Sequence, residues 1–117
     1  MSSHLQRLLE SGAFVLTAEI GPPMSADADV VRRHVAAMRG SVDAINLTDN
    51  QTAMVRMSSV AAATIVQAEG VEAVVQMTVR DRNRIGLQSD ILGLAALGIR
   101  NVVCMSGDHP CNGNHAM

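Results

Sequence analysis

The sequence predicts an α/β fold in which a parallel sheet is built from repeated β–α units. Four apolar segments rich in β-branched residues begin at positions 14, 43, 73 and 101, so successive starts lie 29, 30 and 28 residues apart. A segment of helical character separates each pair. This alternation is typical of parallel strands joined by right-handed crossover helices. The 117 residues have room for a single domain, residues 1–117.

The predicted strands are short and almost continuously apolar. Strands of this composition fit a sheet that is covered on both faces, or the wall of a barrel. We therefore expect Cys104, inside the last strand, to point into the core. The strands cover residues 14–20 (FVLTAEI), 43–49 (DAINLTD), 73–79 (AVVQMTV) and 101–107 (NVVCMSG).

Four helices are predicted, and each has residues that suit its ends. The first covers roughly Ser3 to Glu10 and precedes the repeats, and the others cover 27–40, 58–70 and 87–99. Ile99 is placed for the hydrophobic contact of a Schellman cap. The expected end residues are Asp27, Asp29 and Ser58 or Ser59 at the N-termini, and Gly40, Gly70 and Gly98 at the C-termini.

The connection after the first strand distinguishes two parallel architectures. It reads Gly21-Pro22-Pro23, whereas a Rossmann fold has G-x-G-x-x-G there, and the chain has no Walker A sequence. We therefore predict the (βα)8 TIM-barrel type, with only about the first four βα units present in this chain, since a complete barrel takes about 250 residues. The chain is then expected to be a fragment of a longer protein, or one half of a barrel that associates with another half.

Composition argues against several classes of protein. The formal net charge is −2, and the nine basic residues, all arginines, form no stripe interleaved with aromatic residues, so no nucleic-acid binding is predicted. No apolar run is long enough to span a membrane, and residues 1–12 lack the apolar core of a signal peptide. Two cysteines without a pairing pattern fit a reducing compartment, so we expect a cytoplasmic protein.

Polar side chains gather at the carboxyl ends of the predicted strands, where parallel α/β folds bind ligands. This convergence predicts a functional site at that rim. The residues are Glu19; Thr48, Asp49 and Asn50; Gln76, Thr78, Arg80 and Asp81; and Ser106, Asp108 and His109.

Two carboxylates of this set are the main candidates for chemistry. Glu19 lies inside an apolar strand, where burial would raise its pKa, and a raised pKa suits a general acid. Asp108 follows Gly107, and a glycine at this point lets the backbone approach a ligand closely. The alternative role for Asp108 is an Asx turn or a helix cap.

Two further polar clusters have less specific patterns. The run from Arg80 to Arg84 fits a solvated loop with internal ion pairs, with anion binding by Arg80 or Arg84 as the alternative. The second cluster is not spaced as a standard zinc site, so no metal is predicted. It consists of Cys104, His109, Cys111 and His115.

Four ordered segments resemble the methylenetetrahydrofolate reductase family. They are AEIGPP (18–23), INLTDN (45–50), VVQMTVRDRN (74–83) and LAALGIRNVVCMSGDHP (94–110). The similarity runs from Phe14 onward and corresponds to the N-terminal half of the family's barrel. The resemblance implies a (βα)8 barrel with FAD at its carboxyl-terminal rim. It also implies reduction of 5,10-methylenetetrahydrofolate to 5-methyltetrahydrofolate, with hydride from NAD(P)H or another donor, in one-carbon metabolism and methionine biosynthesis.

The resemblance also implies roles for individual residues. Glu19 would protonate the bridging nitrogen of the folate, and Asp108 would lie near the flavin and stabilise positive charge on the folate. The implied cofactor-binding residues are Thr48, Asp49, Gln51, Gln76, Ser106, Gly107, Asp108, His115 and Ala116.

The chain departs from the family pattern at three places. Ser106 stands where many relatives have arginine, Gln76 replaces a frequent histidine, and the sequence stops at Met117. We therefore expect this chain alone to be inactive, and to form a homo-oligomer or associate with the missing half-barrel or another one-carbon enzyme subunit. Two alternatives remain open: a flavin-independent folate reductase or folate-binding methyl-transfer subunit, and a non-catalytic half-barrel.

Overall fold

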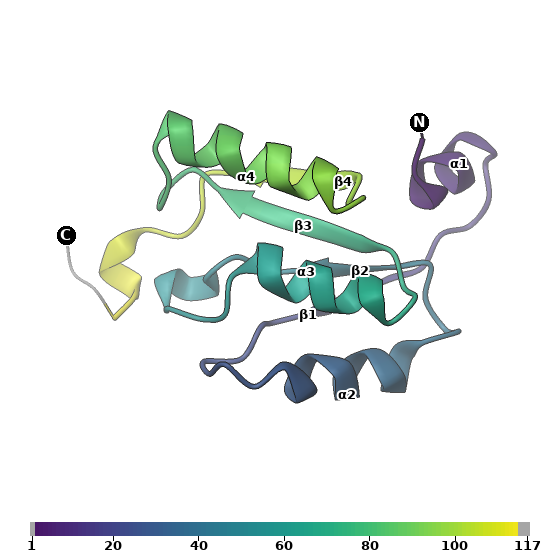
Figure 1. Ribbon diagram of the computed structural model, residues 1–117, viewed down its shortest axis with the longest axis horizontal. Helices are drawn as coiled ribbons and strands as arrows, with labels where there is room; N and C mark the ends of the chain where they lie inside the picture. The colour runs from purple at the N-terminus through teal and green to yellow at the C-terminus, as the bar shows by residue number, and fades with distance from the viewer. Residues whose placement is uncertain (1, 115–117) are drawn as a thin grey trace.

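The protein has four parallel strands in one sheet, in the sequential order β1-β2-β3-β4 (Figure 1). The structure is a computed structural model that describes residues 2–114, so His115 and Ala116 lie outside the described residues. The strands are β1 (Thr17–Ile20), β2 (Ala44–Leu47), β3 (Ala73–Thr78) and β4 (Asn101–Met105). The predicted α/β class with a parallel sheet is confirmed, whereas closure of a barrel stays a prediction.

Helices alternate with the strands as the sequence indicates. They are α1 (His4–Glu10), α2 (Ala28–Met38), α3 (Ser59–Ala68) and α4 (Arg84–Ala96), with short 3-10 turns η1 (Gln51–Ala53) and η2 (Pro110–Asn112). The Schellman cap at the end of α4 is confirmed, because the Ile99 N–H donates to the Leu94 carbonyl at 3.0 Å and Ile99 is buried. Within the described residues, no helix is long and apolar enough to cross a membrane.

Two predicted starts were each wrong by three residues. β1 begins at Thr17 rather than at Phe14, since the Leu16 N–H is bound by the Asp43 carboxylate at 2.9 Å and Phe14 is 91% exposed. α4 begins at Arg84 rather than at position 87, since the Asn83 side chain caps it by accepting the Gly86 N–H at 2.8 Å.

One face of the sheet packs against α2, α3 and α4 and forms the core, and Figure 1 shows these helices along the sheet. Full burial of one large aliphatic side chain stabilises the fold by about 2 kcal/mol. The core includes Ile45, Leu47, Val75 and Met77 from the strands and Val31, Val35, Ala62, Val66 and Leu94 from the helices.

β4 is more exposed than the sequence predicts. Val102 and Val103 are 36% and 40% exposed, and Cys104 is exposed rather than directed into the core. β4 is the last strand of the described sheet and pairs with β3 only. β4 therefore has the sequence pattern of a buried strand, but no segment of residues 2–114 covers its second edge.

The amino ends of the strands are closed by α1. The Glu72 carboxylate accepts the N–H groups of His4 and Leu5 at 3.0 and 2.9 Å, and also the Asn101 side chain at 2.8 Å. Partial burial opposes ionisation of Glu72, but these hydrogen bonds and the charge of His4 outweigh it and lower its pKa. Glu72 therefore holds α1 against β3 and β4.

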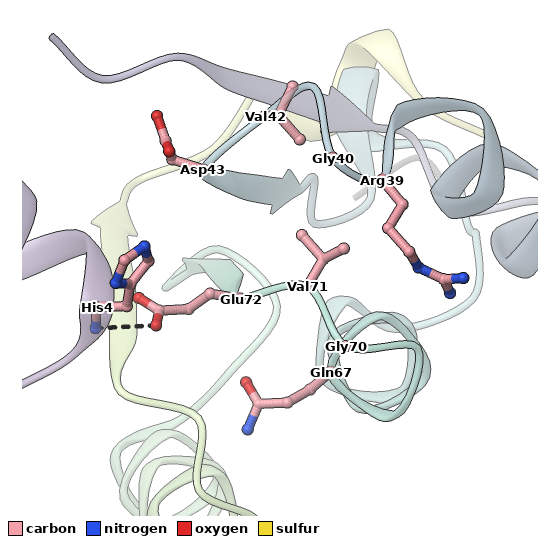
Figure 2. Close-up of a pocket in the computed structure, with 9 residues that line it drawn as sticks. All are labelled: His4, Arg39, Gly40, Val42, Asp43, Gln67, Gly70, Val71 and Glu72. Carbon is pink, nitrogen blue, oxygen red and sulfur yellow. Dashed lines mark hydrogen bonds between the residues drawn. The ribbon is translucent and has the colours of Figure 1, made fainter.

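A cavity of about 520 Å³ lies beside this contact, and Figure 2 shows Val42 and Val71 pointing toward each other within its lining. Its charged side chains already have partners in the chain. Arg39 binds Glu69 at 2.9 Å, and Asp43 accepts the Leu16 N–H. Because parallel α/β folds bind ligands at the opposite end of the strands, this cavity is not the candidate site.

Candidate functional site

Polar residues from the carboxyl ends of β2, β3 and β4 line one cavity of about 130 Å³. Strand direction places them there, since all four strands are parallel and end at the same edge of the sheet. The lining residues are Thr48, Asp49, Gln51, Gln76, Thr78, Arg80, Met105, Gly107 and Asp108. Six of the predicted cofactor-binding residues are among them: Thr48, Asp49, Gln51, Gln76, Gly107 and Asp108.

Glu19 lies next to this group on the face of the sheet opposite the helices. Its Oε1 accepts a hydrogen bond from Gln76 Nε2 at 3.1 Å, although β2 separates their strands. The predicted burial of Glu19 is wrong for the described chain, where the residue is exposed. Residues 2–114 contain no element that covers the carboxylate, because all the packed helices lie on the other face.

Thr48 and Gln51 form the β2 side of the cavity. The Thr48 hydroxyl is hydrogen-bonded to Gln51 Oε1, and the Gln51 amide lies over Gly21. A Cβ at position 21 would come within 3.0 Å of Gln51 Oε1. Glycine at the end of β1 therefore leaves room for Gln51 to fold back toward the sheet.

Asp49 is buried, with a side chain that is 1% exposed, and its carboxylate is engaged within the chain. Oδ2 accepts the Thr78 N–H at 2.8 Å and Arg82 Nη1 at 2.5 Å. Arg82 also binds Asp90 at 3.0 Å. Burial would lower the pKa of Arg82, but the hydrogen bonds and charges of Asp49 and Asp90 outweigh it and raise that pKa. This ion-pair network joins β2, β3 and α4.

Arg80 joins three loops at the rim. Its guanidinium binds the Asp81 carboxylate at 2.6 Å and donates to the backbone carbonyls of Asp108 at 3.0 Å and Asn50 at 3.2 Å. The predicted internal ion pair is confirmed. The predicted solvation holds for Asp81, Asn83 and Arg84, which are exposed, but not for Arg80 and Arg82, whose side chains are 7% and 13% exposed. The hydrogen bond with Asp81 raises the pKa of Arg80.

The loop after β2 has an unusual backbone that Asp108 supports. Asn50, Thr52 and Ala53 have φ values of 48°, 57° and 56°, in the left-handed region. Asp108 Oδ2 accepts the Thr52 N–H at 2.6 Å, so the β4 end stabilises a strained conformation at the β2 end. The carboxylate thus has a structural contact at the site.

Gly107 brings the β4 end close to β3. Its φ is 87°, and a Cβ there would lie 3.0 Å from Thr78 Cγ2. The close approach that the structure shows here is to Thr78, whereas the expected approach of a ligand to Gly107 stays a prediction. Ser106 is exposed and is not among the residues that line the cavity.

The sequence predicts that Thr78 lies at the rim but assigns it no role. It is 2% exposed and lines the cavity, and its hydroxyl is buried without a hydrogen-bond partner among residues 2–114. Its two-residue spacing from Gln76 puts both side chains on one face of β3. A buried polar atom without a partner at the wall of a cavity is a candidate ligand contact.

The Cys/His cluster has a local structural contact. His109 Nδ1 accepts the Cys111 N–H at 3.1 Å and caps η2, and both cysteines are exposed free thiols. Across residues 2–114, no group of three or more potential ligands is placed to hold a metal ion.

Parallel βα units with polar residues at their carboxyl rim define the class of α/β proteins that bind small-molecule ligands at strand ends. The family model described as Methylenetetrahydrofolate reductase matches residues 4–117, so the chain belongs to this family. A search of the curated proteins gives no match. Family membership indicates an oxidoreductase with folate-related reductase activity.

Proposed function

We propose that this protein reduces 5,10-methylenetetrahydrofolate to 5-methyltetrahydrofolate through bound FAD, with NAD(P)H as the hydride donor. The observation that carries the proposal is the contact between Glu19 and Gln76, 3.1 Å long, beside the polar rim cavity. This contact places an ionisable acid beside neutral hydrogen-bonding groups on the open face of the sheet. The acid suits reaction of the folate, and the neutral groups suit binding of the flavin.

The residues of the rim cavity fit one edge of a flavin ring. That edge alternates carbonyl oxygens and ring nitrogens, and the chain supplies neutral amides and hydroxyls opposite it: Thr48, Gln51, Gln76 and Thr78. The buried Thr78 hydroxyl has no hydrogen-bond partner in the described part of the chain, which leaves it available for such a contact. When bound, FAD supplies a carrier that takes a hydride from the nicotinamide and passes it to the folate. Ser106 and Gly107 would border the ring, while Asp49 would hold Thr78 in place.

Glu19 supplies the proton in this proposal. Its carboxyl group donates to the bridging nitrogen of the folate, which opens the five-membered ring and leaves a cationic iminium. Gln76 binds Oε1 and orients the carboxyl group, and Oε2 has no hydrogen-bond partner within the part of the chain that the structure describes. The free oxygen is therefore the one available to the substrate.

Asp108 supplies negative charge beside the reacting centre. Its side chain is fixed by the Thr52 N–H, so the charge has a defined place at the rim. We assign it the stabilisation of the cationic iminium, an effect that strengthens once water is excluded from the site.

The proposal includes further βα units that complete a barrel, either on the same chain or on a partner. Its support is the open face of the sheet, where Glu19 is exposed and Val103 is 40% exposed. Such units would cover this face and supply the other contacts to both ligands.

The cofactor is tested by purifying the protein in its native assembly and recording its visible spectrum. We expect flavin absorption that bleaches with NAD(P)H and returns when methylenetetrahydrofolate is added. A colourless protein that still reduces the folate would favour the flavin-independent alternative, which is motivated by Ser106 standing where many relatives have arginine. A colourless protein that takes up no FAD and reduces no folate would contradict the proposal.

A further inference from the structure

A second cavity at the carboxyl edge has a composition different from that of the rim cavity. It measures about 360 Å³ and lies between the loop after β1 and the segment before α3. Arg56 is the one charged residue in its lining. The lining residues are Met24, Ser25, Ala26, Val55, Arg56 and Met57.

The guanidinium of Arg56 is incompletely paired. Nε is buried and has no hydrogen-bond partner among the residues that the structure describes, and Nη1 makes one long contact of 3.4 Å with the Pro22 carbonyl. No carboxylate in residues 2–114 lies within ion-pair distance of it, in contrast to Arg80 and Arg82. A guanidinium keeps its charge in proteins, and a partly buried charge without a partner is costly. An anion bound in the cavity would remove this cost.

Both walls of the cavity are held in place before any ligand binds. The Met57 N–H donates to the Pro23 carbonyl at 2.8 Å, which joins the two loops. The Arg56 N–H donates to Asn50 Oδ1 at 2.8 Å, which fixes the backbone that carries the guanidinium. A preformed site of this kind binds with a smaller entropic cost.

The rest of the lining is apolar. Met24 and Val55 are 58% and 52% exposed, and Met57 is partly buried. Methionine side chains adapt to irregular or flat apolar groups and make favourable contacts with aromatic rings. The cavity thus offers one cation next to an apolar surface.

We propose that Arg56 binds an oxyanion of an organic ligand whose apolar or aromatic body lies against Met24, Val55 and Met57. The identity of this ligand rests on the proposed function, because both ligands in that proposal, the folate and FAD, carry an oxyanion. The folate has an aromatic ring linked to glutamate carboxylates, and FAD has a pyrophosphate next to its adenosine.

Isothermal titration calorimetry on the native assembly tests the proposal with three probes: 4-aminobenzoyl-glutamate, adenosine diphosphate and neutral 4-aminobenzamide. We expect Arg56→Gln to weaken binding of one anionic probe by about tenfold or more, with the neutral probe unaffected. Arg33→Gln, on the exposed face of α2, is the matched control and should bind like the wild type. Loss confined to the first probe identifies the folate carboxylate, and loss confined to the second identifies the dinucleotide phosphate.

Unchanged affinity of Arg56→Gln for both anionic probes would overturn the proposal, as would the failure of both to bind the wild type. If the variant does not fold, phenylglyoxal labelling of the wild type replaces it, since a bound anion should protect Arg56 but not Arg33. Equal labelling of Arg56 with and without the probes would also overturn the proposal. Binding is measured without turnover, so Arg56-dependent binding in a protein that reduces no folate would contradict only the proposed function.

Discussion

Gln76 Nε2 donates a hydrogen bond to Glu19 Oε1 at 3.1 Å, joining two strands that are not neighbours. Adjacent strands lie about 4.8 Å apart, so β1 and β3 are separated by about twice that distance. Their side chains meet above β2, on the face away from the helices. In closed parallel barrels, side chains from alternate strands meet in layers inside the barrel. The contact therefore supports a sheet that forms part of a barrel wall.

Replacing Gln76 tests whether this contact orients the acid. We expect Gln76→Leu to lower the rate of folate reduction by about tenfold, since it removes the hydrogen bond that orients the carboxyl group of Glu19, while reduction of the flavin by NAD(P)H changes less. Gln88→Leu, exposed on α4, is the control and should leave both rates unchanged. Equal slowing of both half-reactions by Gln76→Leu would argue against an orienting role.

The buried pair of Asp49 and Arg82 should dominate the stability of the rim. Arg82→Met leaves a carboxylate that is 1% exposed without its cation, so we expect a loss of about 3–5 kcal/mol in the free energy of unfolding. Arg84 lies two residues further along the chain and is exposed, so Arg84→Met should change the free energy of unfolding by less than about 0.5 kcal/mol. Urea unfolding measures the stability of both variants. Equal losses in Arg82→Met and Arg84→Met would contradict a dominant role for the Asp49–Arg82 pair.

Two glycines at positive φ separate backbone strain from lack of space. Gly12 has open space around its Cβ direction, whereas a Cβ on Gly107 would meet Thr78 at 3.0 Å. Gly12→Ala should lower the free energy of unfolding by about 1 kcal/mol, through backbone strain alone. We expect Gly107→Ala to cost more and also to weaken flavin binding. A Gly107→Ala variant as stable as Gly12→Ala would show that β4 moves away from Thr78 easily.

The docking of α1 should depend on pH through Glu72. The pKa of Glu72 is lower in the folded protein than in the unfolded chain, so its contribution is complete above the unfolded pKa and is lost as the pH falls through the folded pKa. Since α1 buries none of its own residues, its amide protection, corrected for the intrinsic exchange rate at each pH, should fall as the pH drops below the unfolded pKa of Glu72. Glu72→Gln should remove this dependence, whereas Glu10→Gln should retain it. If the pH response persists in Glu72→Gln, another titratable group must cause it.

Local features of the fold could be predicted from the sequence because neighbouring residues determine them. The caps at Asp27 and Ser58 and the Schellman turn at Ile99 depend on residues within one helical turn, and all three are observed. The strand repeat and the common rim likewise follow from apolar spacing and parallel topology.

Long-range contacts could not be predicted in the same way. Asp49 and Arg82 are 33 positions apart, and the sequence does not show which of several arginines reaches a given carboxylate. The exposure of Cys104 and Glu19 depends on what covers the edges and the open face of the sheet. Apolar periodicity predicts that these surfaces become covered, but not by which segment.

Glu19→Gln is the most direct test of the central claim, because it keeps the size of the side chain and a carbonyl oxygen to accept the Gln76 hydrogen bond but removes the transferable proton. Stopped-flow absorption of the native assembly would follow the two half-reactions separately. We predict that reduction of the flavin by NAD(P)H is retained, while its reoxidation by methylenetetrahydrofolate slows by about a hundredfold or more. Glu10→Gln, on the exposed side of α1, should match the wild type in both. Folate reduction by Glu19→Gln at the wild-type rate would contradict the account.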